Sequence, residues 1–84
     1  MALSSPLVEV VLPELDATPI VLSVWFADVG DPAYEGDRLV EVLVGGATFD
    51  VPAPVTGRLA EKQALADDVV QPGQVLGWMD ENGN

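Results

Sequence analysis

Residues 39–54 read Leu39-Val40-Glu41-Val42-Leu43-Val44-Gly45-Gly46-Ala47-Thr48-Phe49-Asp50-Val51-Pro52-Ala53-Pro54, two apolar-rich runs on either side of a Gly-Gly pair. This arrangement is typical of a β-hairpin with a two-residue turn. A type I′ turn needs a positive φ at both central residues, which glycine adopts without steric cost. Because side chains alternate along a strand, the two faces are predicted to be a core face of Val40, Val42, Val44, Ala47, Phe49 and Val51 and a solvent face of Glu41, Leu43, Thr48 and Asp50.

Further strands are predicted on both sides of the hairpin, from short β-branched or apolar runs between Gly, Pro and Asp turn signals. They cover residues 7–12, 20–26 and 75–79, with a short strand or bend around Ala33-Tyr34. Residues 60–66 are good helix formers, but a helix there would be too short to be stable alone and would lie between β signals. The aromatic side chains are expected to pack in or around the core, namely Trp25, Phe26, Phe49 and Trp78.

An internal repeat indicates two similar halves. Residues 29–39 lie over residues 66–76 with a shift of 37 positions, and residues 49–52 lie over 10–13 with a shift of 39. The second shift implies that the loop after Pro13 is two residues longer than the loop after Pro52. The first shift matches Asn82-Gly83 with Gly45-Gly46, and a twofold relation would place the chain termini and the hairpin turn at opposite ends. The prediction is a small all-β sandwich or flattened barrel.

The composition excludes several chemistries. The chain has 14 acidic residues, three Lys or Arg residues, no cysteine and no histidine, for a formal net charge of −11. Thiol chemistry is therefore absent, and the commonest general base and metal ligand is missing. Phosphate recognition needs clustered Lys and Arg, so neither nucleic acid nor an anionic membrane surface is an expected partner. An acidic surface suits solubility, or docking on a basic partner.

The sequence predicts a cytoplasmic protein without catalytic residues. It holds no run long enough to cross a membrane, and residues 1–6 lack the basic start of a signal peptide. No Ser/His pair, Cys/His pair or nucleotide-binding loop is present. The acidic pairs Asp67-Asp68 and Asp80-Glu81 lack the spacing of an EF-hand loop, so no metal site is predicted. Glu41 and Asp50 face each other across the predicted hairpin, a like-charge pair that would suit a basic partner or a metal, or that the surface simply tolerates.

Taken in order along the chain, a set of short motifs resembles the biotinyl/lipoyl carrier domains. Each motif is weak alone, but their order and spacing are specific, and together they cover about residues 8–80. The matching pieces are Leu12-Pro13, Ile20-Val21 with Trp25, Val29-Gly30-Asp31, Glu35-Gly36-Asp37, Leu39-Val40-Glu41-Val42, Ala47, Asp50-Val51-Pro52-Ala53-Pro54, Thr56-Gly57 and Gln71-Pro72-Gly73. The resemblance implies a flattened barrel of two four-stranded antiparallel sheets with an internal twofold. It would make residues 7–80 one domain, between a flexible lead (1–6) and a polar tail (81–84).

The chain departs from these domains at the residue that defines them. The resemblance implies a lysine at the hairpin tip, joined to lipoate or biotin, that swings between active sites. Counting back from Ala53, that lysine falls on Gly46 and its acidic neighbour on Gly45. Glycine has no amine to acylate, and Lys62, the only lysine, lies well away from the tip. No cofactor is therefore expected, and Gly-Gly is what a turn selected for folding alone would carry.

Three functions stay open at this point. The first is a non-catalytic interaction or structural module of an acyl-transfer or carboxylase complex. It would act through an acidic face or an apolar tip formed by Leu43, Val44, Gly45, Gly46 and Ala47, which could also pair two copies of the chain. The second is a true acyl or CO₂ carrier whose group is attached elsewhere, and the third is a relic or decoy that competes with a functional lipoyl domain.

Overall fold

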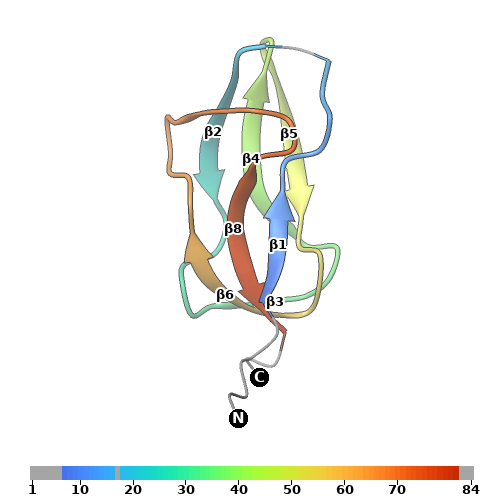
Figure 1. Cartoon of the computed structure of the whole chain (residues 1–84), viewed down its shortest axis with the longest axis vertical. Coiled ribbons are helices and arrows are strands. Elements are labelled where there is room, and N and C mark those ends of the chain that lie inside the picture. The colour runs from blue at the N-terminus through green and yellow to red at the C-terminus, as the bar shows by residue number, and fades with distance from the viewer. Residues whose placement is uncertain (1–6, 17, 82–84) are drawn as a thin grey trace.

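The computed structural model describes residues 7–16 and 18–81, and within these residues the fold is entirely β (Figure 1). The predicted lead and Asn82-Gly83 lie outside this part of the chain. Residues 60–66 form no helix, because the sixth strand runs to Lys62 and turns follow it. The strands are β1 (Leu7–Val11), β2 (Ile20–Trp25), β3 (Pro32–Ala33), β4 (Arg38–Val44), β5 (Ala47–Pro52), β6 (Gly57–Lys62), β7 (Val69–Val70) and β8 (Val75–Asp80).

These strands form two four-stranded antiparallel sheets, as predicted. The orders are β1-β8-β6-β3 in one sheet and β5-β4-β2-β7 in the other. The core between the sheets consists of aliphatic side chains and Met79, and no polar side chain of the described residues is buried with it. Leu22 and Leu59 are fully buried in opposite sheets. Burying such side chains supplies most of the stability of a domain of this size.

The two sheets are related by an internal twofold, and their hydrogen bonds repeat with a shift of 37. The Gly30 amide donates to Leu59 O at 2.8 Å, and the Asp67 amide donates to Leu22 O at 2.8 Å. Within the turns, the Asp31 carboxylate accepts from the Asp28 amide as the Asp68 carboxylate accepts from the Leu65 amide, both at 2.9 Å. β1 begins and β8 ends at one end of the molecule, and the β4–β5 turn lies at the other (Figure 1).

The predicted shift of 39 before the first loop is wrong. The Ala53 amide donates to Asp37 O, and the Leu12 amide donates to Gln74 O, so Ala53 and Leu12 occupy equivalent positions and the shift is 41. Pro13 is thus equivalent to Pro54, not to Pro52. Since β2 and β6 keep the shift of 37, the loop before β2 is four residues longer than the one before β6. That extra length lies at the hairpin end of the molecule (Figure 1).

The pairing of the hairpin is confirmed, but Ala47, which was predicted on the core face, is exposed because it directly follows the turn. β4 and β5 pair Val44 with Ala47, Val42 with Phe49, and Val40 with Val51, and both turn glycines have positive φ. A register shift between Arg38 and Val40 places Leu39 inside as well as Val40, which simple alternation does not predict.

The expected packing of the aromatic side chains is only partly right. Trp25 and Trp78 are half-buried. Phe49 belongs to the inward face but is 39% exposed, because β5 is an edge strand. Phe26 is 41% exposed and lies outside the core, with the Arg38 guanidinium 4.6 Å from its ring centre.

The backbone conformation at Asp67 can be compared with that at the equivalent position of the other half. It has a φ of 75°, and its equivalent, Gly30, has a φ of 97°. Alanine in this region is strained, aspartate less so, and glycine not at all. We expect Asp67→Ala to lower the free energy of unfolding by about 1 kcal/mol and Asp67→Gly to raise it by about 0.5 kcal/mol. Urea unfolding measures both, and equal midpoints for the two variants would contradict a strained backbone at Asp67.

Candidate functional site

The β4–β5 turn exposes the position at which the resemblance places an acceptor lysine. Gly45 has a φ of 54° and Gly46 a φ of 89°, as a type I′ turn requires. A Cβ atom built on Gly46 would meet nothing within 4 Å. A side chain at this position would therefore extend freely into solvent, but glycine offers no group to acylate.

The structure separates the five residues predicted to contact a partner. Gly45, Gly46 and Ala47 are exposed at the turn. Leu43 is 42% exposed on the outer face of its sheet, as the alternation predicts. Val44 instead turns inward and packs against the core. The apolar surface at this end is therefore provided by the face of the sheet more than by the turn itself.

Lys62 is held by its neighbours far from the turn. Its ammonium nitrogen lies 3.6 Å from Asp28 Oδ1 and 5.7 Å from the centre of the Trp25 ring. The side chain is only 21% exposed. Trp25 is itself fixed, because its indole Nε1–H donates to Ala64 O at 2.9 Å. This lysine therefore stabilises the local structure and does not extend from the surface as a mobile arm would.

The like-charge pair on the hairpin has one cation beside it. Glu41 and Asp50 are cross-strand partners, as predicted. Arg38 Nη1 lies 3.6 Å from Asp50 Oδ2, and the same guanidinium lies over Phe26. One cation of the chain thus offsets part of the negative charge of this pair.

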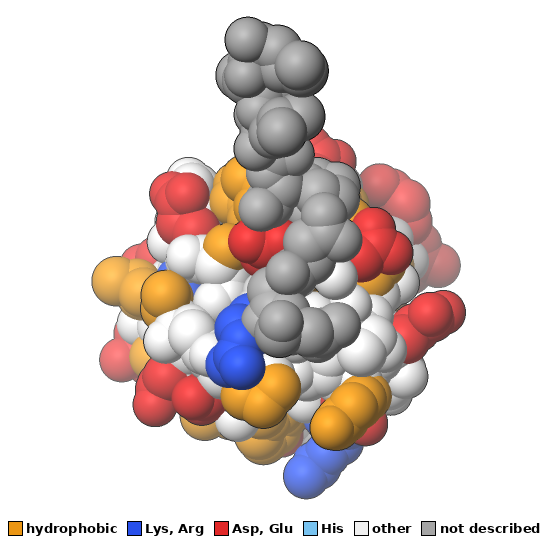
Figure 2. Space-filling view, turned by 90° about the horizontal axis from the view of Figure 1, so that it is seen from below, with side chains coloured by type: hydrophobic (Ala, Val, Ile, Leu, Met, Phe, Trp, Pro, Cys, Tyr) orange, Lys and Arg blue, Asp and Glu red, His pale blue; other side chains and the backbone are white. Residues whose placement is uncertain are grey.

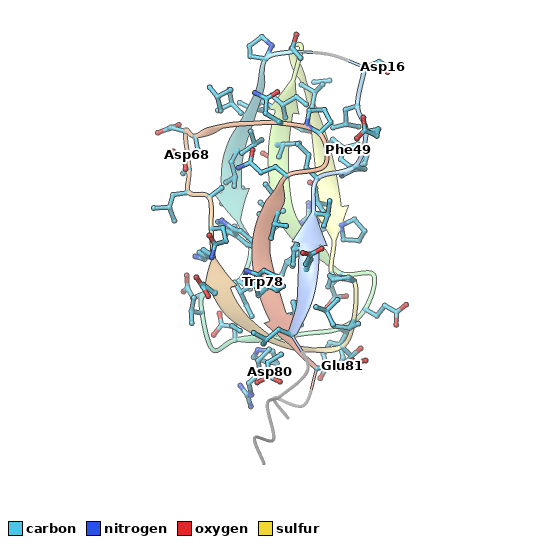
Figure 3. The ribbon with its side chains drawn as sticks, viewed as in Figure 1. Asp16, Phe49, Asp68, Trp78, Asp80 and Glu81 are labelled. Atoms are coloured by element: carbon cyan, nitrogen blue, oxygen red, sulfur yellow. The ribbon has the colours of Figure 1, made fainter. Side chains whose placement is uncertain are left out.

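The carboxylates of the described residues form no group of three that could hold a metal ion. Asp68 lies near the hairpin end, whereas Asp80 and Glu81 lie at the opposite end (Figure 3). Asp68 also closes its own turn by accepting from the Leu65 amide. These carboxylates serve turns and surface charge.

No helix of the described residues is long and apolar enough to cross a membrane.

A shallow apolar groove of about 320 Å³ lies between the edge strands β1 and β5. Proline has no amide hydrogen, so the prolines at this seam limit the addition of a further strand to either edge. The groove is lined by Glu9, Val10, Val11, Pro13, Val51, Pro52 and Pro54.

One apolar surface was not predicted from the sequence. β7 is only two residues long and lies outside the predicted strands, so the outward position of Val69 was missed. The repeat could have revealed it, because a shift of 37 carries Pro32–Ala33 onto Val69–Val70. In the structure Val69 pairs with Val21, which pairs with Leu43.

Comparison with known proteins gives one informative similarity. No protein-family model matches the chain. Over 52 residues, 62% of its length, the chain is 42% identical to the lipoamide acyltransferase component of the branched-chain alpha-keto acid dehydrogenase complex of Pseudomonas aeruginosa. The matched part is 11% of that protein, so the chain spans only a small fraction of its relative. Together with the two four-stranded sheets, this similarity supports a lipoyl-type domain.

Proposed function

We propose that this chain is a lipoyl- or biotinyl-type domain that cannot be lipoylated or biotinylated at its hairpin and that works as a non-catalytic interaction or structural module. The observation that carries the proposal is the turn itself. Gly46 occupies the acceptor position in open space, with a backbone that suits glycine and no amine to acylate. The scaffold of a carrier domain is present without its attachment point.

The proposed setting is a cytoplasmic multienzyme system of the 2-oxo acid dehydrogenase or biotin-dependent carboxylase type. The similarity to a lipoamide acyltransferase component supports the first of these. The chain would contact a subunit of such a complex through the hairpin end, with Leu43, Gly45, Gly46 and Ala47 exposed for this purpose. Val44 is only partly exposed and contributes mainly to the packing of the tip.

The alternative is a carrier domain with its prosthetic group on Lys62. The structure weighs against this alternative, because that ammonium group is paired with Asp28 and partly covered by Trp25. A ligase would have to break these contacts before it could reach the nitrogen.

We expect the purified chain to keep its unmodified mass when it is produced in cells that also overproduce lipoate ligase and biotin ligase. Intact-mass spectrometry measures this directly. A lipoyl domain that has its acceptor lysine, produced in the same cells, shows that the ligases are active. A mass increase of one lipoyl or biotinyl group on this chain would overturn the proposal, and Lys62→Arg would show whether Lys62 carries the group.

A further inference from the structure

The internal twofold allows equivalent surface positions to be compared on one scaffold. On the outer face of the β5-β4-β2-β7 sheet, Leu43, Val21 and Val69 stand side by side in one cross-strand row, here called the tip row. The equivalent positions of the other sheet are Asp80, Arg58 and Pro32, which are also cross-strand partners. Neighbouring side chains in such a row point to the same face.

The fold does not require apolar residues in the tip row. The equivalent row carries an acid and a base at the same backbone positions, with the same pairing. Leu43 is nevertheless 42% exposed and Val69 60% exposed, with Val21 half-buried between them. Val24, also exposed, continues the apolar surface beside Glu41. Exposed apolar side chains that are contiguous, and that folding does not demand, are typical of a docking surface.

The charges around the tip row are acidic. Asp67 and Asp68 directly precede Val69, and Asp16 lies at the same end of the molecule (Figure 3). The chain's three cations lie elsewhere. Arg38 stands at the opposite end of β4, and Arg58 and Lys62 belong to β6 of the other sheet. Basic side chains are visible among the acids in the view from the end opposite the hairpin (Figure 2).

We infer that the tip row is the docking surface of the module, and that it receives a protein surface with apolar side chains flanked by Lys or Arg. This inference rests on the proposed function and names the face and the partner chemistry it would use. The acids around the row complement such a partner and would speed its approach. A second copy of the chain would instead bring Asp67 and Asp68 against the same acids, so self-pairing here is disfavoured.

The chemistry of the surface can be tested with defined probes. A short end-blocked peptide of leucine and lysine is titrated into the ¹⁵N-labelled chain, beside the same peptide with every leucine replaced by serine. We expect amide shifts centred on Leu43, Val21 and Val69 with the first peptide. The second peptide should bind about tenfold more weakly, because it lacks the apolar contact. Shifts centred on Asp80 and Arg58, or equal affinity of the two peptides, would overturn the inference.

A matched pair of variants separates apolar docking from simple charge attraction. Val69 and Val29 are 60% and 57% exposed, and Val29 lies in the turn before Gly30, outside the tip row. Each gains one negative charge as Val69→Asp or Val29→Asp. If charge alone attracts the peptide, both variants bind it more tightly. We expect Val69→Asp to bind it about tenfold more weakly and Val29→Asp to bind it at least as tightly as the parent chain. Leu43→Thr removes apolar surface from the tip row without adding a charge, and it therefore provides a second test of apolar docking.

The partner is tested in a separate arm. The labelled chain is mixed with the purified branched-chain alpha-keto acid dehydrogenase complex of Pseudomonas aeruginosa, and the same amides are followed. Binding that Val69→Asp abolishes and Val29→Asp retains supports both proposals. Binding that Val69→Asp leaves intact keeps the proposed setting and overturns the tip row as its docking surface. Binding of the leucine-lysine peptide at the tip row, without binding of the complex, keeps the docking surface and counts against that setting.

Discussion

Gly77→Ala is expected to lower the free energy of unfolding by about 3 kcal/mol, at the upper end of what overpacking a core usually costs. A Cβ atom at this position would lie 2.5 Å from the carbonyl oxygen of Glu61 and 2.9 Å from Cη2 of Trp25. β8 lies inside its sheet between β1 and β6, so the chain cannot relieve the contact by fraying at an edge. Either the β6–β8 ladder must open or the indole must move.

Besides the Glu61 carbonyl, the Trp25 indole, which bridges the two sheets, requires a glycine here. Trp25 ends β2 in one sheet, its ring lies against Gly77 in the other, and its Nε1–H donates to Ala64 O. Under the internal twofold, Trp25 is equivalent to Lys62 and Gly77 to Val40. In one half, the two equivalent positions hold the large ring of Trp25 and a glycine, Gly77. In the other half, they hold the flexible side chain of Lys62 and a valine, Val40. Alanine at 77 would add volume where the Glu61 carbonyl and the Trp25 ring already fill the space.

Urea unfolding measures the loss of stability, and the indole proton of Trp25 in the NMR spectrum reports whether the bridge to Ala64 persists. Gly36→Ala is the control, because Gly36 has a φ of 91° but open space around it. It should cost only about 1 kcal/mol of backbone strain. In Trp25→Leu/Gly77→Ala the two effects should not add, since removing the ring removes part of the clash. A Gly77→Ala variant as stable as Gly36→Ala would contradict this account of the sheet-to-sheet contact.

The hairpin could be predicted because its determinants are local. Two glycines set the turn, and the turn sets the register of every pair that follows it. The sequence does not reveal how far an edge strand is covered. Phe49 was assigned to the correct face, yet it is more than a third exposed, because β5 is an edge strand of its sheet. Periodicity identifies the face of a residue, and the topology decides its burial.

The repeat was correct where its matches were spaced turn residues and wrong where it relied on one proline. Asp31 with Asp68 and Gly36 with Gly73 fix the shift of 37, because each closes or shapes an equivalent turn. Pro13 was matched to Pro52, although Pro54 was equally available. Only the hydrogen bonds of Leu12 and Ala53 decide between the two, and these are long-range contacts that a local motif does not contain.

The turn that carries the candidate site could be predicted from the sequence, whereas the apolar row beside it could not. The resemblance, with the spacing counted back from Ala53, assigns the acceptor position to Gly46, and the structure has Gly46 in the turn between β4 and β5. The tip row could not be predicted, because it joins residues from three strands and one of those strands is only two residues long. A strand of that length has no periodicity to recognise.

Gly45→Asp with Gly46→Lys is expected to convert an unmodified chain into one that a lipoate ligase acylates. The new lysine would meet no neighbouring atom within 4 Å of its Cβ, and the strands behind it keep their pairing. Aspartate tolerates a φ near 54°, whereas lysine at a φ near 89° is strained. The double variant should therefore lose about 1–2 kcal/mol of stability while it gains a site.

Intact mass after co-expression with the ligase measures whether a lipoyl group has been added. If the group is still added when Lys62→Arg is introduced into the same chain, it is attached to residue 46. Gly46→Lys alone shows whether the acidic neighbour is needed. If the double variant is acylated, the turn residues were the sole barrier, and the rest of the hairpin still has the shape the ligase recognises. A folded double variant that keeps its unmodified mass would contradict this prediction. It would locate further losses on the surface around the turn, where Leu43 and Val69 already give the sheet an apolar face.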